Sequence, residues 1–181
     1  MRKKMKHIQN RFTFASASII AMVLMMTSVV AASEDTVVFL VRHAEKTEAK
    51  DDPVLSEAGR QRSQQLANLL SDAEIDHIHS TDFKRTRETA APIAGMTGLD
   101  VEIYTWENPV SLAQSLNQDG KRHLVVGHSN TTTELVALLG GEPGTEIEES
   151  SEYDRLYILT INPAGVTTLL LRYGSEYLGP E

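Results

Sequence analysis

Short runs of apolar residues alternate with amphipathic segments along most of this chain. Continuous apolar runs are typical of strands buried on both faces of a sheet, whereas apolar positions three or four residues apart indicate helices. The predicted strands are residues 36–41, 75–80, 101–105, 123–126, 156–161 and 166–171. The predicted helices are residues 56–70, 83–93, 110–116 and 131–139.

Local signals support several of these boundaries. Ser56 is a candidate N-cap for the first helix, and Gly140 follows the last one. Residues 162–165 (Asn-Pro-Ala-Gly) separate the last two strands with a sequence typical of a hairpin turn. Alternating strands and helices followed by a hairpin predict an α/β fold. We expect a three-layer sandwich with a mostly parallel central sheet, helices on both faces and an antiparallel C-terminal hairpin.

The first 32 residues do not follow this pattern. Basic residues without any acidic residue occupy the first eleven positions, and no charge occurs from Phe12 to Ser33. Residues 30–32 (Val-Ala-Ala) then offer small side chains at a cleavage site, so the layout is that of a secretory signal peptide. Uncleaved, residues 12–32 are about long enough to anchor the chain in a membrane. We therefore expect a leader over 1–32, one domain over 33–181, and a periplasmic or secreted protein.

Removing the leader changes the charge balance. Residues 33–181 hold 12 basic and 25 acidic side chains, a formal net charge of −13. Nucleic-acid binding needs a basic face, so we expect no nucleic-acid partner. An anionic ligand must be held by a local basic cluster against the field of the rest of the domain. The absence of cysteine excludes disulfides, thiolate metal sites and a cysteine nucleophile.

Two histidines directly follow predicted strands. His43 comes after the run 36–41, and His128 comes after the run 123–126. Arg85 lies at the start of a helix that also follows a strand end, and Arg42 precedes His43. Ligands of parallel sheets bind beyond the carboxyl ends of the strands, so we expect these side chains to meet there. Two guanidinium groups and two imidazoles at one point indicate a phosphoryl site.

Four segments together resemble the histidine phosphatase superfamily, which includes phosphoglycerate mutases, fructose bisphosphatases and small phosphohistidine phosphatases. The segments are Arg42-His43-Ala44-Glu45, Leu55-Ser56-Glu57-Ala58-Gly59-Arg60, Ser80 through Ala90, and Gly127-His128-Ser129-Asn130-Thr131. The resemblance implies a phosphoric monoester hydrolase whose nucleophile, His43, forms a phosphohistidine that water hydrolyses. It implies that Arg42, Arg85 and His128 hold the phosphoryl oxygens, and that no metal and no cofactor is required.

The chain departs from the family pattern at two points. Ala44 follows the first histidine where members most often have glycine, and its methyl group narrows the approach of the backbone to phosphate. Many members carry an acidic residue in an insertion after the second helix, but this chain has almost no insertion between residues 94 and 101. Glu107 is the candidate for the acid that protonates the leaving oxygen, with Glu45 and Glu134 as alternatives. A short chain without a large lid predicts an open pocket and argues against a glycolytic mutase.

The missing insertion and the leader favour different substrates. An imidazole leaving group needs little protonation, so a site without an acid favours phosphohistidine or another activated substrate. An exported domain cannot reach cytoplasmic phosphorelays, which favours a phosphorylated small molecule or an envelope sugar phosphate. The sequence leaves both classes open.

Other functions of the same residues are less well supported. A non-catalytic phospho-ligand-binding module of the cell envelope would keep Arg42, Arg85 and His128 but would gain nothing from His43. An esterase is suggested by the likeness of residues 127–131 to Gly-x-Ser-x-Gly, but threonine replaces the final glycine and no histidine follows Ser129. We interpret the remaining histidines of the domain as structural; they are His77, His79 and His123.

Overall fold

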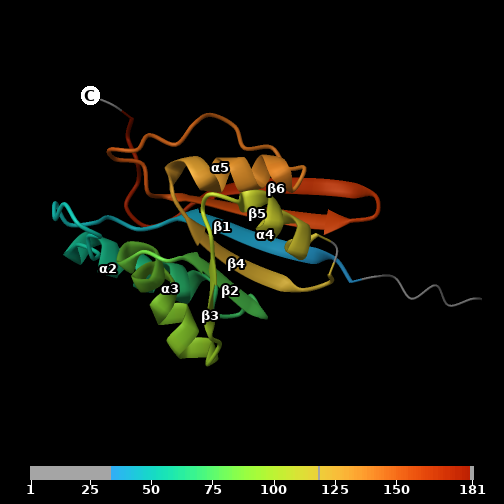
Figure 1. Ribbon diagram of the computed structural model, residues 1–181, viewed down its shortest axis with the longest axis horizontal. Coiled ribbons are helices and arrows are strands. Elements are labelled where there is room, and N and C mark those ends of the chain that lie inside the picture. The colour runs from blue at the N-terminus through green and yellow to red at the C-terminus, as the bar shows by residue number, and fades with distance from the viewer. Residues whose placement is uncertain (1–33, 118, 180–181) are drawn as a thin grey trace, which may run out of the picture. The chain divides into compact units, whose positions relative to one another are not determined.

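The computed structural model describes residues 34–117 and 119–179, which form strands and helices in alternation followed by a strand pair (Figure 1). The expected leader falls on residues that lie outside the described ones, so the division of the chain at residue 32 stays a prediction. The strands are β1 (Thr36–Arg42), β2 (His77–Thr81), β3 (Val101–Tyr104), β4 (Arg122–Gly127), β5 (Arg155–Asn162) and β6 (Gly165–Arg172). The helices are α2 (Glu57–Leu69), α3 (Lys84–Thr97), α4 (Pro109–Leu116) and α5 (Ser129–Leu138).

The described strands form one sheet in the order β3-β2-β4-β1-β5-β6. The first four strands in this order are parallel, whereas β5 pairs antiparallel with both β1 and β6. The predicted mostly parallel sheet with an antiparallel C-terminal hairpin is therefore confirmed. Strands β1 and β4 are neighbours, with Arg42 paired to Gly127, so His43 and His128 leave the sheet side by side.

Helices cover both faces of the sheet, as the three-layer prediction requires. Helices α4 and α5 pack over one face with Leu40 and Val125, while α2 and α3 pack over the other with Val41 and Val126 (Figure 1). Because neighbouring residues of a strand point to opposite faces, the continuous apolar runs of β1 and β4 supply both core layers. No helix within 34–117 and 119–179 is both long and apolar enough to cross a membrane.

The loop after β1 is held tightly against the start of α2. Ser56 is the N-cap of α2, as predicted, and its side chain accepts a hydrogen bond from the backbone N–H of Gly59 at 3.1 Å. A Cβ atom added at Gly59 would lie 2.1 Å from the carbonyl oxygen of Glu45. Glycine at this position therefore allows the helix to pack directly on the segment that follows His43.

Candidate active site

A pocket of about 370 Å³ opens at the carboxyl edge of β1 and β4. Its lining is Arg42, His43, Lys46, Phe83, Arg85, Trp106, His128, Ser129, Asn130 and Glu149. The two histidines and two arginines that the sequence singled out thus lie around one pocket. The parallel pairing of β1 and β4 brings the two histidines together. Strand β2 pairs with β4 on its other side, and helix α3, which follows β2, carries Arg85 in its first turn.

His43 is held in one orientation at the base of this pocket. Its side chain is 3% exposed, and its Nδ1 lies 2.8 Å from the carbonyl oxygen of Ala44. A carbonyl oxygen can only accept, so Nδ1 carries the proton and the lone pair of Nε2 is free. Burial, aided by the positive charge of Arg42, lowers the pKa of His43 to about 3. The imidazole is therefore neutral at ordinary pH, as a nucleophile must be.

His128 lies beside His43 with a ring centroid separation of 5.5 Å. Its Nε2 is 3.0 Å from the hydroxyl of Thr81, and its Nδ1 is 3.5 Å from a terminal nitrogen of Arg85. The guanidinium can only donate, so Nδ1 is the acceptor and Nε2 carries the proton. Burial, with help from Arg85 and Arg42, lowers the pKa of His128 to about 4.

Arg85 faces the same pocket from the first turn of α3. Its Cζ lies 4.5 Å from the centroid of the Phe83 ring, and that ring packs edge-on against His128 at 5.1 Å. The Nε of Arg85 is buried without a hydrogen-bond partner among the described residues. An unpaired buried N–H donor is costly unless a ligand satisfies it, so Arg85 is suited to hold an anion.

Arg42 is placed differently from the sequence expectation of a side chain free to hold phosphate. It is 2% exposed, and its terminal nitrogens donate to the carbonyl oxygens of Glu148, Glu149 and Glu152. Its guanidinium also stacks on Tyr153, with Cζ 4.1 Å from the ring centroid. Arg42 thus holds the loop after α5 at the pocket, and its buried Nε has no hydrogen-bond partner among residues 34–117 and 119–179.

The candidate acids lie in different surroundings. Glu107 is exposed, accepts a hydrogen bond from the Thr105 hydroxyl and does not line the pocket, although its neighbour Trp106 does. Glu45 forms a 2.8 Å ion pair with Arg62, a helix α2 residue whose side chain is buried. Glu134 is exposed on α5 outside this pocket.

Glu149 supplies the carboxylate that lines the pocket among the described residues. No sequence pattern indicates Glu149, because it lies in an acidic loop without a motif. Arg42 holds this loop at the pocket by donating a hydrogen bond to the carbonyl oxygen of Glu149.

Ala44 does not crowd the pocket with its methyl group. Its side chain is fully buried in the core, and its backbone N–H donates to the Thr89 hydroxyl at 3.0 Å. The Thr89 hydroxyl in turn donates to the carbonyl of Arg85 at 2.7 Å. The segment after His43 is therefore fixed to the helix that carries Arg85, a role for threonine that the sequence analysis missed.

Three further histidines form a cluster away from the pocket. His77, His79 and His123 stack with ring centroids 5.2 to 6.1 Å apart. Their rings are nearly parallel and do not converge on one point. No group of three or more histidine, aspartate or glutamate side chains within the described part of the chain is arranged to hold a metal ion.

Both the sequence and the fold are similar to those of known proteins. Residues 38–108 match the sequence model of the histidine phosphatase superfamily (branch 1). A stretch of 76 residues is 39% identical to "Phosphoglycerate mutase-like protein 4" of Arabidopsis thaliana, covering 38% of this chain and 33% of that protein. A stretch of 71 residues is 37% identical to "Probable phosphoglycerate mutase GpmB" of Escherichia coli (strain K12 / DH10B), covering 35% of this chain and 33% of that protein. The matches thus span about a third of the length of these curated relatives.

Structural similarity extends further along the chain. The fold is similar to that of the protein histidine phosphatase SixA complexed with tungstate, with a TM-score of 0.61 and 20% sequence identity over 75% of this chain and 96% of that one. Residues 38–108, which hold Arg42, His43 and Arg85, are therefore similar to the histidine phosphatase superfamily (branch 1), and the fold of the described domain is similar to that of SixA.

Proposed function

We propose that this chain is an exported phosphatase that hydrolyses phosphomonoesters through a phosphohistidine on His43. The observation that carries the proposal is the state of this side chain. Its Nδ1 proton is held by the Ala44 carbonyl, so the lone pair of Nε2 is available within a pocket lined by Arg85 and His128. Nucleophile and anion-binding groups in one pocket are the arrangement that phosphoryl transfer requires.

The reaction has two steps. Nε2 of His43 attacks phosphorus while the bond to the ester oxygen breaks, and the alcohol leaves with a proton from the carboxyl group of Glu149. Water then gives a proton back to Glu149 as it attacks the phosphohistidine, which releases inorganic phosphate and returns the neutral imidazole.

Arg85 and the Nε of Arg42 stabilise the negative charge on the phosphoryl oxygens, and His128 joins them when its Nε2–H turns from the Thr81 hydroxyl to a phosphoryl oxygen. Preorganised charge of this kind is the main contribution in phosphoryl transfer. No step calls for a metal ion or an organic cofactor.

The first experiment is hydrolysis of p-nitrophenyl phosphate by the full chain in EDTA, beside the His43→Ala variant. Nitrophenolate is a good leaving group, so a weak or absent acid does not hide activity. We expect turnover by the parent and none by the variant, with the same circular dichroism spectrum. Turnover that survives in His43→Ala would refute the mechanism. A folded parent that binds phosphate without turnover would favour the phospho-ligand-binding module instead.

The proton donor is tested by comparing Glu149→Gln with Glu107→Gln. We propose Glu149 as the donor, because its carboxylate lines the pocket, whereas Glu107 lies outside it. Glu149→Gln should slow an alkyl phosphate about 100-fold, within the usual range for general acid catalysis, and p-nitrophenyl phosphate much less. Glu107→Gln should leave both rates unchanged. The reverse pattern would return the role to Glu107.

A phosphorylated small molecule of the cell envelope remains the proposed substrate class. The open pocket and the proposed export support it, since both allow access to extracytoplasmic phosphomonoesters. Phosphohistidine is the second candidate, and the likeness to the SixA fold favours it. Rates on a phosphohistidine peptide and on a sugar phosphate, measured side by side, separate the two.

A further inference from the structure

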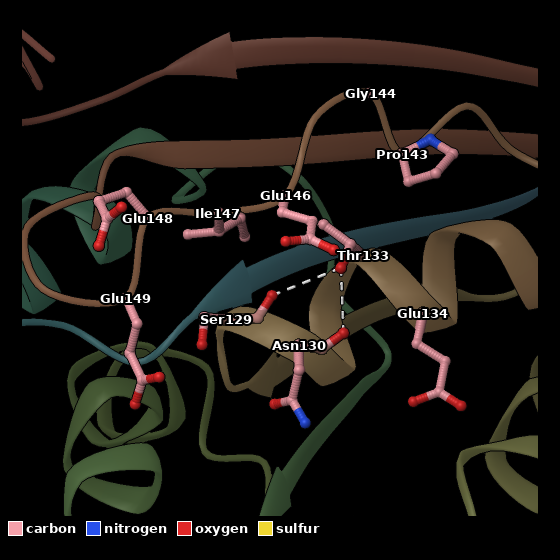
Figure 2. Close-up of a pocket in the computed structure, with 10 residues that line it drawn as sticks. All are labelled: Ser129, Asn130, Thr133, Glu134, Pro143, Gly144, Glu146, Ile147, Glu148 and Glu149. Atoms are coloured by element: carbon pink, nitrogen blue, oxygen red, sulfur yellow. Dashed lines mark hydrogen bonds between the residues drawn. The ribbon is translucent and has the colours of Figure 1, made fainter.

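The phosphoryl pocket continues into a second, larger hollow. This acidic hollow has a volume of about 640 Å³, and Ser129, Asn130 and Glu149 line both spaces. Figure 2 shows it between the start of α5 and the loop from Pro143 to Glu149. The alcohol portion of a substrate with its phosphate beside His43 therefore has room in this hollow.

The lining of the acidic hollow carries negative charge only. Its charged side chains are Glu134, Glu146, Glu148 and Glu149, and no lysine, arginine or histidine lines it among the described residues. Glu148 accepts hydrogen bonds from Ser150, but the other three carboxylates have no hydrogen-bond or ion-pair partner within the described part of the chain. These carboxylates are available to a ligand that approaches from the phosphoryl pocket.

An independent observation indicates an anion-binding group at the other end of the same space. Arg42 is buried and lines the phosphoryl pocket, and its Nε has no partner in the described part of the chain, so this N–H can bind an anionic group there. Its terminal nitrogens hold the carbonyls of Glu148 and Glu149, which sets the acidic loop at a constant position relative to the phosphate. The combined space therefore has a basic end and an acidic end.

We propose that the substrate is a phosphomonoester whose alcohol carries an ammonium group, bound in the acidic hollow by the carboxylates of Glu134, Glu146 and Glu148. This inference rests on the proposed phosphatase function and narrows its substrate class. A leaving group with a carboxylate or second phosphate would meet several like charges, whereas an ammonium group would meet opposite ones. The net charge of −13 over residues 33–181, from 12 basic and 25 acidic side chains, also favours a substrate with a positively charged group.

The test uses two matched pairs of substrates on the full chain: phosphorylethanolamine against 2-hydroxyethyl phosphate, and glucosamine 6-phosphate against glucose 6-phosphate. Within each pair an ammonium group replaces a hydroxyl. We expect kcat/KM to favour the ammonium member of at least one pair by about tenfold, as two or three exposed charge contacts allow. The preference should shrink as salt is raised. Equal kcat/KM within both pairs would overturn the proposal.

Two variants test whether the acidic hollow causes the preference for the ammonium substrate. Glu134→Gln/Glu146→Gln should remove most of the preference through KM and leave p-nitrophenyl phosphate hydrolysis unchanged. Glu142→Gln is the matched control, because Glu142 is an exposed residue near the same loop that does not line the hollow. A preference that survives the double variant, or is lost equally in the control, would refute the assignment.

Failure of the inference and failure of the phosphatase function give different results. Hydrolysis of p-nitrophenyl phosphate without any preference within the pairs overturns only the inference. If the chain does not turn over any substrate, calorimetric binding of both pairs to His43→Ala still measures the preference for the ammonium group.

Discussion

The nitrogen that His43 presents to a phosphoryl group follows from one backbone contact. Nδ1 donates a hydrogen bond to the carbonyl of Ala44, and this directs the lone pair of Nε2 toward the pocket. The sequence motif identified the histidine, but a backbone carbonyl leaves no mark on the sequence. Burial is also the main cause of its lowered pKa, ahead of the charges of Arg42 and Arg85.

The protonation of His43 can be measured directly. Because the pKa of the buried ring is about 3, it should stay neutral in the free protein from pH 8 down to pH 5. NMR of the chain labelled in histidine, assigned by comparison with His43→Ala, should show no titration of this ring in that range. A midpoint near pH 6.5, the ordinary value for histidine, would contradict the burial that the structure assigns.

Arg85 should matter for the ligand rather than for the fold. Arg85→Ala removes a charge-assisted contact to phosphate, so the inhibition constant for inorganic phosphate should rise about 10- to 100-fold. The urea midpoint should change little, because the side chain is only half-buried. Arg87→Ala is the matched control, since Arg87 is exposed and pairs with Asp82. An unchanged inhibition constant in Arg85→Ala would remove its role in phosphate binding.

At the scale of the elements, pairing of strands produces contacts that their order in the chain does not suggest. Strand β2 pairs with both β3 and β4, which stacks His77 and His79 on His123. The sequence indicated only that these histidines are structural residues. The ring of His79 is 3.1 Å from that of His123, while Glu102 and Asp119 lie at the two ends of the cluster.

This cluster should make the fold sensitive to acid. Burial lowers the pKa of His79 to about 4, below its ordinary value of about 6.5. The unfolded chain then binds more protons between these values, so stability is complete above about pH 6.5 and is lost as the pH falls toward 4. Unfolding free energy from urea titrations should fall by on the order of 2 kcal/mol between pH 7 and pH 4.5 through His79 alone.

A variant separates the contribution of His79 to the acid sensitivity of the fold from the contributions of other histidines. His43 and His128 have lowered pKa values too and act in the same pH window. His79→Asn should therefore reduce the loss of stability between pH 7 and pH 4.5 without abolishing it. An identical pH dependence in the parent and the variant would show that His79 is not responsible.

The elements themselves were predicted well from the apolar pattern, and their ends less well. Helix α3 was expected to end at residue 93 but continues to Thr97, where Gly98 with a φ of 75° ends it. Strand β2 begins at His77 rather than at residue 75, because pairing with β4 starts there. Apolar periodicity reports which side chains are buried, whereas ends depend on caps and on the neighbouring strand.

At the scale of the whole molecule, the expected leader gives a prediction independent of the site. If residues 1–32 are a cleaved signal peptide, protein recovered from outside the cytoplasm should begin at Ser33, as N-terminal sequencing would show. Intact chain in the membrane fraction would indicate the anchor instead. Full-length protein in the cytoplasm would contradict export altogether.

The sequence by itself determined the alternating elements, the mostly parallel sheet, and the meeting of His43, His128 and Arg85. It could do so because apolar runs specify buried strands, and parallel strands end at one edge. Only the tertiary structure decided that Arg42 donates hydrogen bonds to carbonyl oxygens of the loop after α5, and that Glu149 rather than Glu107 lines the pocket. Those contacts join residues more than 100 positions apart, and they depend on how the loop folds back, which no local pattern encodes.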